Sequence, residues 1–566
     1  MCPDKKRPAE NTCRIVKGLD AVWAHFCPSK PCLPLSIDGS VKGNRQGFLS
    51  RAITRRSDQN SKIKYCFFIL LFCRQLGKKV RMDFFAKLTS LTGAKKLLYY
   101  YNTTRPHAQP AFLPVFAAAG RIGTRGGGRM LPQPVEYVLE RLENAGFAAF
   151  AVGGCVRDTL LGRVPGDWDV TTAARPEQVL ALFDGCAIPT GLKHGTVTVR
   201  AEGMGIEVTT FRADGTYTDH RRPDAVTFSR RLEDDLSRRD LTVNAMAMDR
   251  RGQITDLCGG REDLKVGVLR CVGDPERRFR EDALRILRTL RFAAVLGFAI
   301  ELRTAAALHE TAPLLTYIAP ERILSEMDRA LCGGHILPML LDYPDVLAVF
   351  LPEIAPCVGF DQCNRHHIYD VWGHSAHAVA AIAPEPVLRW TMLLHDVGKP
   401  ACFTRDEQGV GHFYGHPAVS AELAEGACRR LRMDSRSAER IVTLVRWHDR
   451  DIPRTDRAIA RAVGKLGEDV FRQLLAVKRA DNAAQSPDDR HRLADIQQAE
   501  DILDGLLARQ QCFSLRDLAV KGGDMAALGL RGREIGDMLR ALLDAVLDGA
   551  PNERGSLLAL AREKMK

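Results

Sequence analysis

The segment Phe150-Ala151-Val152-Gly153-Gly154-Cys155-Val156-Arg157-Asp158, followed by Asp167-Trp168-Asp169, carries the strongest structural signal in this chain. It reads as a short β-strand, a glycine turn, the start of a helix and then a second strand that contains two aspartates. Alternate residues of a strand point to the same side, so we expect Asp167 and Asp169 to present both carboxylates to one point. Mg²⁺ takes few protein carboxylates and keeps substrate phosphates as ligands, so the pattern predicts a site for Mg²⁺ and a nucleoside triphosphate.

Regular periodicity on both sides of this segment predicts a small α/β unit over residues 130–262. A helix over 134–144 would bury the apolar face formed by Val135, Val138, Leu139 and Leu142. The further elements that we expect, in chain order, are a strand at 148–152, a helix at 156–161, a strand at 168–172, a helix at 176–183 and strands at 195–201 and 205–211.

The glycine pair is placed where a phosphate could approach the backbone. Gly153 and Gly154 lack Cβ atoms, and the N-terminus of the following helix adds N–H donors. Arg157 lies one turn further on and is suited to bind a phosphate. A glycine pair alone is also typical of an ordinary strand-to-helix turn, so this interpretation depends on the arginine and on the two aspartates.

Four motifs occur in a fixed order: Gly-Gly-x-Val-Arg-Asp-x-Leu-Leu-Gly from Gly153, Asp167-x-Asp169, Arg238-Arg239-Asp240-Leu241-Thr242-Val243-Asn244-Ala245-Met246 and Glu281-Asp282-Ala283-Leu284-Arg285. In them the chain resembles the class II nucleotidyltransferases of the polymerase-β superfamily, which include CCA-adding tRNA nucleotidyltransferases and bacterial poly(A) polymerases. The resemblance implies an α+β protein. A small polymerase-β-like head would be followed by mostly α-helical neck, HD and tail domains.

The resemblance also implies roles for individual residues. In the family the two aspartates, here Asp167 and Asp169, are catalytic and bind Mg²⁺, while the glycine pair and the following arginine hold the triphosphate. Arg239 would contact the nucleotide, and Asn244 would shape the cleft near the sugar. The residues 238–244 are expected to begin a helix.

Two residues near the predicted strand 205–211 leave alternatives open. Glu207 is either a third carboxylate of the metal site or a solvent-facing strand residue. Arg212 either contacts phosphates or caps the sheet.

The predicted neck, residues 263–350, begins with a long helical pattern over 276–295. Its expected core positions are Leu284, Leu287, Leu290, Phe292 and Val295. Arg285, Arg288 and Arg291 recur every three residues, so they would line one broad face of the helix, with Asp282 on the same side. Such charges are usually solvated. The resemblance, however, implies that Asp282 and Arg285 select the incoming CTP or ATP by hydrogen bonds to its base, while Arg288 and Arg291 continue the cleft toward the phosphates.

A second constellation, within residues 351–486, resembles an HD-domain metal phosphohydrolase. Its expected ligands are His374, His395, Asp396 and Asp481, and His416 and His448 extend the set toward a second metal. The His-Asp pair is predicted to lie on a helix over 388–397. Imidazole and carboxylate ligands suit Mn²⁺, Ni²⁺, Co²⁺ or Fe²⁺. His366, His367 and His377 are expected to be surface or packing residues.

Charge divides the chain at Met130. The net charge is +12, but 24 of the 81 Lys and Arg residues and only 6 of the 69 Asp and Glu residues precede Met130, so residues 130–566 carry a net charge of −6. Any nucleic-acid surface there must be a local basic patch. Residues 1–129 lack sustained periodicity. We interpret them as an atypical basic extension that results from a mis-assigned start at Met1, the alternatives being a transit peptide or a nucleic-acid-binding arm.

The remaining features favour a cytoplasmic protein. The 16 cysteines are scattered, and the longest apolar run, 65–73, is about half of what spans a bilayer. Residues 487–566 are expected to form a helical tail that packs and holds tRNA. The resemblance thus favours template-independent addition of CCA to the tRNA 3′ end from CTP and ATP, with phosphohydrolase activity at the HD site. The alternatives are a poly(A) polymerase, an enzyme adding only CC or only A, and an RNA-binding phosphohydrolase whose head is inactive.

Overall fold

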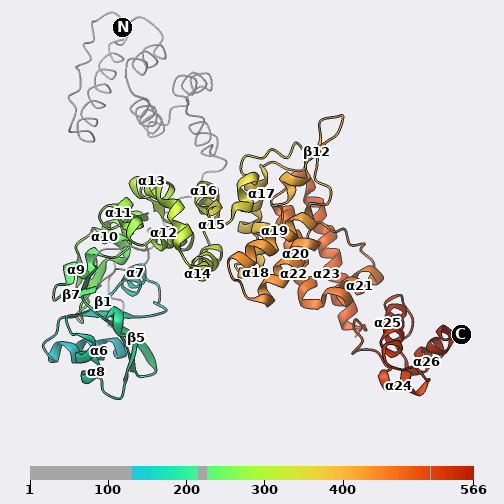
Figure 1. Cartoon of the computed structure of the whole chain (residues 1–566), viewed down its shortest axis with the longest axis horizontal. Helices are drawn as coiled ribbons and strands as arrows, with labels where there is room; N and C mark the ends of the chain where they lie inside the picture. The colour runs from blue at the N-terminus through green and yellow to red at the C-terminus, as the bar shows by residue number, and fades with distance from the viewer. Residues whose placement is uncertain (1–129, 215–225, 510) are drawn as a thin grey trace, which may run out of the picture. The chain divides into compact units, whose positions relative to one another are not determined.

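The computed structural model describes residues 130–214, 226–509 and 511–566, and the interpretation of residues 1–129 lies outside them. The head is built on a seven-stranded sheet with the order β3-β4-β5-β2-β1-β8-β9 (Figure 1). Strands β2 and β5 are parallel, and all other neighbours in this sheet are antiparallel. The strands are β1 (Ala149–Val152), β2 (Asp169–Thr172), β3 (Ala187–Gly191), β4 (Thr196–Ala201), β5 (Met204–Thr210), β8 (Met246–Met248) and β9 (Ile254–Asp256).

Sequence periodicity found most of the head. Helix α6 (Gln133–Asn144) buries the four residues that were predicted for its apolar face. Strands β3, β8 and β9 were not predicted, because β8 is buried at every position and β9 has three residues, so neither shows an alternating pattern. The other head elements are α7 (Gly154–Leu160), α8 (Pro176–Leu182), α9 (Leu232–Ser237), α10 (Gly260–Val266) and the strand pair β6 (Arg212–Asp214) and β7 (Val226–Phe228).

Helix α12 (Leu284–Leu296) joins the head to the helices that follow. Its Phe292 and Leu296 belong to the apolar core of the head, whereas Leu287 and Leu290 belong to the core of the neck and HD helices. Val295 was predicted to be a core residue but is 40% exposed. A short parallel pair, β10 (Val268–Leu269) and β11 (Ala299–Ile300), brackets this helix.

The neck and HD helices share one core, which extends from Cys271 to Leu547. Helices α17 to α23 gather around it (Figure 1). The elements in this part are α11 (Pro275–Glu281), α13 (Leu302–Thr311), α14 (Pro320–Leu331), α15 (Ile336–Asp342), α16 (Pro344–Ala348), α17 (Val371–Ala381), α18 (Pro386–Leu394), β12 (Thr404–Arg405), β13 (Gly411–His412), α19 (His416–Arg430), α20 (Ser435–Trp447), α21 (Asp456–Leu466), α22 (Glu468–Ala483) and α23 (Arg492–Ala508).

The tail helices are α24 (Gly522–Ala527), α25 (Arg533–Leu547) and α26 (Arg554–Lys564), and they pack around a small apolar core of their own. A sheet-based head followed by helical parts is an α+β arrangement, which confirms the expected fold class. In the described part of the chain, no helix has the length and apolarity needed to cross a bilayer.

Candidate active site and metal centre

The acidic residues of the head meet where β2 and β5 run side by side. Asp169 opens β2, and its Cα partner in the parallel register is Glu207 of β5. Asp167 precedes the strand and does not belong to it, although the buried Trp168 between the two aspartates preserves the expected alternation. Burial and the carboxylate of Asp167 raise the pKa of Asp169 to about 6, with Glu207 acting in the same direction and Arg239 opposing it. Mutual repulsion of this kind is what a bound cation would relieve.

Gly153 keeps the space beside these carboxylates open. It precedes α7 with φ +87°, a conformation that favours glycine. A Cβ atom at this position would lie 3.1 Å from Nη1 of Arg239 and 3.9 Å from Oδ2 of Asp169. A side chain here would therefore displace the arginine from the carboxylates.

The two arginines predicted to bind the triphosphate differ in their partners. Arg157 is buried and donates to both carboxylate oxygens of Asp158, each at 2.9 Å, and to Oδ1 of Asn244 at 2.7 Å. Arg239 donates from Nη2 to Asp235 at 3.1 Å, and its buried Nε has no hydrogen-bond acceptor among the described residues. Arg239 is thus the arginine placed at the carboxylates, whereas Arg157 is buried against Asp158 and Asn244.

The sequence led us to expect that residues 238–244 begin a helix, but no α-helix begins at Arg239. Helix α9 covers the preceding acidic run instead, because acidic side chains stabilise the N-terminal turn of a helix. Asp235, a residue not singled out from sequence, is fully buried and accepts hydrogen bonds from Arg238 and Arg239. Although burial alone would raise the pKa of Asp235, these arginines lower it.

The predicted continuous helix over 276–295 is wrong, because it breaks at Asp282. Helix α11 ends at Glu281, and Asp282 is extended with φ −138° and ψ 103°. Its Oδ1 accepts the backbone N–H of Leu284 at 3.1 Å, a local bond by which aspartate competes with helix formation. Asp282 therefore lies in the break and Arg285 in the first turn of α12, rather than on one face of one helix.

The three arginines of α12 each bind a different acid. Arg285 pairs with Glu281 at 3.2 Å, Arg288 with Asp240 at 2.7 Å and Arg291 with Glu326 at 2.7 Å. The ring of Phe292 lies among cations, with guanidinium carbons at 4.2 Å (Arg291), 5.0 Å (Arg157) and 5.7 Å (Arg288) from its centre. Burial opposes ionisation of Asp240, but Arg288 outweighs it and holds the pKa of Asp240 well below its usual range. The neck thus fixes the cationic side of the head site.

In the HD domain, the structure brings all six predicted ligands together around Asp396. One group is His374, His395 and Asp396, and the other is Asp396, His416 and His448, the ligand atoms of each lying within 4.8 Å of one another. Asp481 joins the first group, with Oδ1 at 2.9 Å from Nε2 of His374. Asp396 is therefore shared between the two groups.

Backbone carbonyls determine which nitrogen of each histidine faces the centre. Each histidine donates from Nδ1 to a main-chain carbonyl: His374 to Ala484 at 3.3 Å, His395 to Met392 at 2.8 Å, His416 to Phe413 at 2.8 Å and His448 to Val445 at 2.7 Å. In a neutral imidazole the other nitrogen is then unprotonated. The Nε2 atoms face one another at 3.3 Å, both between His374 and His395 and between His416 and His448. Bare lone pairs at this distance fit metal ions, since metal-bound histidines are oriented in this way.

The charges at the HD centre agree with this interpretation. Asp396 is buried, and neither of its oxygens receives a hydrogen bond of good geometry from the residues that the structure describes, although Nζ of Lys399 lies 2.7 Å from Oδ2. Burial disfavours charged His395, but Asp396 and Asp481 outweigh it and raise the pKa of His395 to about 10. Without a metal, a proton on His395 would supply the positive charge that these carboxylates need.

One detail of the HD prediction differs from the structure. Helix α18 ends at Leu394, so His395 follows its last residue and Asp396 lies in the next turn. His367 packs edge-on against His374 with ring centres 5.2 Å apart, and burial together with Lys399 lowers the pKa of His367 to about 3. His366 pairs with Asp489, and His377 stacks on Tyr369, as surface and packing residues do.

Three known families match consecutive parts of the chain. They are "Poly A polymerase head domain" at residues 149–270, "Probable RNA and SrmB- binding site of polymerase A" at 297–358 and "HD domain" at 366–485. The CCA-adding enzyme of Leuconostoc mesenteroides is 51% identical over 256 residues, which are 43% of this chain and 63% of that protein. The CCA-adding enzyme of Geobacillus thermodenitrificans is 48% identical over 221 residues, 38% of this chain and 54% of that protein. The matches thus span between about half and two thirds of these relatives.

A solved structure extends the similarity. The Bacillus stearothermophilus CCA-adding enzyme, crystallised in complex with CTP, matches with a TM-score of 0.59 and 30% identity, over 76% of this chain and 97% of that chain. This chain belongs to the CCA-adding enzyme family. The family is one of nucleotidyltransferases, so the resemblance inferred from the four motifs is confirmed.

Within this CCA-adding family member, sequence reasoning missed several residues that position the site. Asp240 lies inside a recognised motif, but its role depends on the distant Arg288 that it meets, and Lys399 acts through its contact with the buried Asp396. Glu326 lies on a helix with a strongly apolar face, and nothing in its spacing marks it as the partner of Arg291. The aspartates, the glycine pair and the histidines were found because their chemistry requires those residue types.

Proposed function

We propose that this protein adds C, C and A to the 3′ end of tRNA in the cytoplasm, from CTP and ATP and without a nucleic-acid template. The observation that carries the proposal is the meeting of Asp169, Gly153 and Arg239 at one end of the central strands β1 and β2, in a chain of the CCA-adding family. The CTP complex of the Bacillus stearothermophilus relative supports a nucleoside triphosphate as the ligand.

The residues of the head divide the work of nucleotidyl transfer. Asp167 and Asp169 would hold Mg²⁺, with Glu207 as a third carboxylate at the same strand edge. A pair of such ions neutralises the phosphates and aligns the attacking 3′-hydroxyl with the α-phosphorus. Gly153 and Gly154 let the triphosphate approach the backbone, while Arg239 compensates its charge and Arg157, behind it, supports the same wall.

The neck would choose the base. Asp282 and Arg285 lie at the break between α11 and α12, where a carboxylate acceptor and a guanidinium donor can pair with a nucleobase edge. Arg288 and Arg291 extend the positive charge toward the phosphates. On this proposal, Asp282→Ala loses the discrimination between CTP and ATP, and Glu276→Ala, on the exposed side of α11, keeps it.

The deciding experiment supplies tRNA that ends at the discriminator base with CTP and ATP, singly and together. Addition of C, C and A followed by termination is the expected result, read on a sequencing gel. Long A-tails from ATP alone would identify a poly(A) polymerase, and arrest after CC, or addition of A only to tRNA that already ends in CC, would identify a partial activity. No addition under any condition would overturn the proposal.

We also propose that the HD centre binds two transition-metal ions, Ni²⁺, Mn²⁺ or Co²⁺, and hydrolyses phosphate esters. The four inward-facing Nε2 atoms and the shared Asp396 support this set of ligands. The test is the metal content of the purified protein and its hydrolysis of a 2′,3′-cyclic phosphate with and without Ni²⁺. Absence of metal after incubation with all three ions would contradict the proposal.

A further inference from the structure

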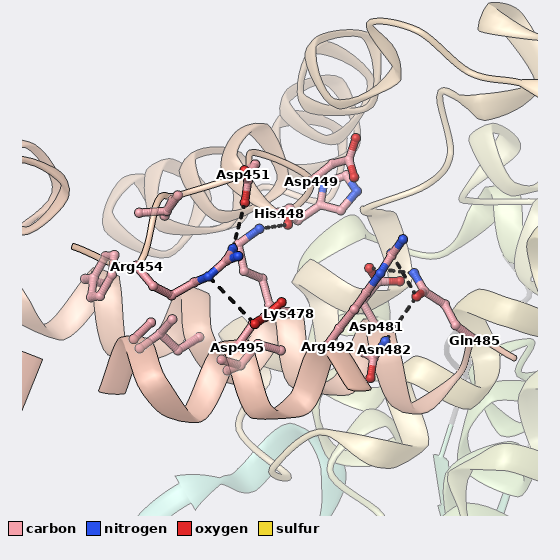
Figure 2. A pocket seen from close by; sticks show the side chains of 15 residues that line it. His448, Asp449, Asp451, Arg454, Lys478, Asp481, Asn482, Gln485, Arg492 and Asp495 are labelled. Carbon is pink, nitrogen blue, oxygen red and sulfur yellow. Dashed lines mark hydrogen bonds and ion pairs between the residues drawn. The ribbon is translucent and has the colours of Figure 1, made fainter. Parts of the chain in front are cut away.

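A pocket of ≈ 370 Å³ reaches the HD centre between α22, α23 and the loop after α20 (Figure 2). His448 and Asp481, two of the six centre residues, line it. The side chain of Asp481 is 18% exposed, whereas those of His374 and His395 are fully buried. The pocket is therefore a route from solvent to the centre. Its volume lies near the lower end of the range for small-molecule sites, roughly 300–1,000 Å³, which suits a single nucleotide.

The cations of this pocket differ in what they already bind (Figure 2). Lys478 donates to the carbonyls of His448 and Arg450, each at 2.7 Å. Arg454 pairs with Asp451 at 3.4 Å and with Asp495 at 3.7 Å. Their charges are thus engaged within the protein.

Arg492, at the start of α23, has no comparable partner. In the part of the chain that the structure describes, no carboxylate oxygen lies within 4 Å of its guanidinium nitrogens, and its one hydrogen bond is a 3.5 Å contact to Oε1 of Gln485. Gln485 in turn donates to Oδ2 of Asp481 at 3.3 Å. The guanidinium is exposed and points into the same space as Asp481 (Figure 2). An exposed arginine beside a metal centre is suited to bind a phosphate through two parallel N–H···O bonds.

Part of the lining is apolar. Ile452, Phe471, Leu475, Ile496 and Ala499 contribute to it. Pockets for small ligands combine such a wall with a few convergent polar groups. An inorganic anion would leave the apolar wall unused, whereas a nucleoside would cover it.

We propose that this pocket is the substrate subsite of the HD centre and takes a phosphate ester of one nucleoside. Arg492 binds the phosphate beside the metals, and the apolar wall contacts the nucleoside. The inference rests on the proposed phosphohydrolase function. The ester could come from a free nucleotide or from the terminal nucleotide of an RNA, since both present the same chemistry.

The test measures binding of adenosine 3′-phosphate by calorimetry to the full-length, metal-loaded protein. Arg492→Gln should weaken binding roughly tenfold and leave the metal content unchanged, because charge-assisted hydrogen bonds to the phosphate are lost. Arg490→Gln, an exposed arginine outside the pocket, is the matched control and should bind as the wild type does. In hydrolysis, Arg492→Gln should raise KM more than it lowers kcat.

A second variant separates pocket occupancy from loss of charge. Ile452→Trp, in the loop after α20, narrows the pocket and should weaken binding while the ion content stays the same. Replacing the free nucleotide by a short RNA with a 3′-phosphate identifies the source: an Arg492-dependent affinity for the RNA indicates a terminal nucleotide, and dependence for adenosine 3′-phosphate alone indicates a free one.

The results of these experiments test the nucleotide subsite and the proposed phosphohydrolase activity separately. Unchanged binding in Arg492→Gln, or no binding of adenosine 3′-phosphate or of the 3′-phosphorylated RNA by the wild type, overturns the subsite even if the protein hydrolyses esters. Arg492-dependent binding without hydrolysis of any ester retains the subsite and contradicts the proposed phosphohydrolase function.

Discussion

The head site and the HD centre, the two places where we propose bound cations, differ in how far their side chains are buried. In the head, Asp167 is exposed, and Glu207 of the interior strand β5 is exposed as well. In the HD centre, His374 and His395 are fully buried, and main-chain carbonyls fix their rings. An open carboxylate site suits Mg²⁺ that arrives with a nucleotide, whereas a closed imidazole site suits a resident transition metal.

The two sites also differ in what holds their charged side chains. The HD ligands are positioned by backbone atoms of their own domain. At the head site one ion pair joins two parts of the chain, since Arg288 of the neck pairs with Asp240 of the head. We therefore expect the HD centre to be sensitive to loss of its own ligands, and the head site to be sensitive to changes in the neck.

The largest expected effect is the loss of nucleotide addition in Asp169→Ala. Removing a metal-binding carboxylate forfeits several kcal/mol of transition-state stabilisation, which corresponds to a rate decrease on the order of a thousandfold. Addition to tRNA should fail, while the metal content of the HD centre stays at the wild-type level. Glu177→Ala, which replaces an exposed acidic residue on α8 of the head, is the control. A parallel loss of HD metal would show that the two sites are not independent.

The substitution Asp396→Asn tests the buried HD centre. It removes the shared carboxylate and leaves the ammonium group of Lys399 buried beside a neutral amide. An uncompensated buried charge costs about 3–5 kcal/mol. We expect the loss of both metal ions and a lower free energy of unfolding, with nucleotide addition retained at a permissive temperature.

The control for this variant is Asp406→Asn, which removes a half-exposed pair with His412 in the same domain. A pair of this kind contributes about 0–1 kcal/mol. If both variants lose the same stability and both keep their metal, Asp396 is not the bridging ligand.

The residues of the two sites could be predicted from the sequence to different extents, and the reasons are physical. Metal chemistry restricts residue type, so Asp167, Asp169 and the histidines could be identified from their order alone. The break in the helix at Asp282 could not be predicted, because the apolar periodicity continues through it. What marks the break is a local hydrogen bond from the backbone N–H of Leu284 to the side chain of Asp282. In the same way, nothing in the sequence distinguishes Asp235 from its acidic neighbours, and only the packed structure shows it to be buried and paired with two arginines.

Prediction of the fold from the sequence has the same limit. Helix α6 was predicted with all four of its buried residues, since its amphipathic pattern is local. Strand β8 was missed, because it is buried on both faces and carries no alternation. The sharing of Asp396 between two groups of ligands is likewise a property of the assembled helices, and no spacing along the chain expresses it.

A smaller effect is expected when the ion pair between Asp240 of the head and Arg288 of the neck is removed. Asp240→Asn removes the partner of Arg288 and should cost about 2 kcal/mol of stability, less than a fully buried pair because Arg288 is partly exposed. Since Arg288 lowers the pKa of Asp240, its stabilisation is present above about pH 4 and is lost as the pH falls further. The variant should therefore show a flatter acid limb in the dependence of unfolding free energy on pH, and a raised KM for both nucleotides.

Asp249→Asn is the matched control for that link, since Asp249 caps a head loop through backbone N–H groups that asparagine can also bind. It should leave KM and the acid limb unchanged. Equal effects of the two substitutions would mean that the head site does not depend on the neck.

The smallest effect, and the most specific test of how the neck supports the head, is Phe292→Leu. The ring has the guanidinium groups of Arg157, Arg288 and Arg291 around it, and a cation–π contact contributes about 0.5–1 kcal/mol where solvent is near. Leucine keeps the apolar contact with the head core but removes the ring that spaces the three cations. We expect KM for CTP and for ATP to rise together, roughly three- to tenfold, with their ratio unchanged, because the cations bind phosphate and not base. Phe298→Leu, at the partly buried edge of the same core, removes a ring over which no arginine of the described segments lies, and it should leave both KM values as they are. A change in the ratio of the two KM values in Phe292→Leu would mean that the ring acts on base selection at Asp282 and Arg285 instead of on the phosphates.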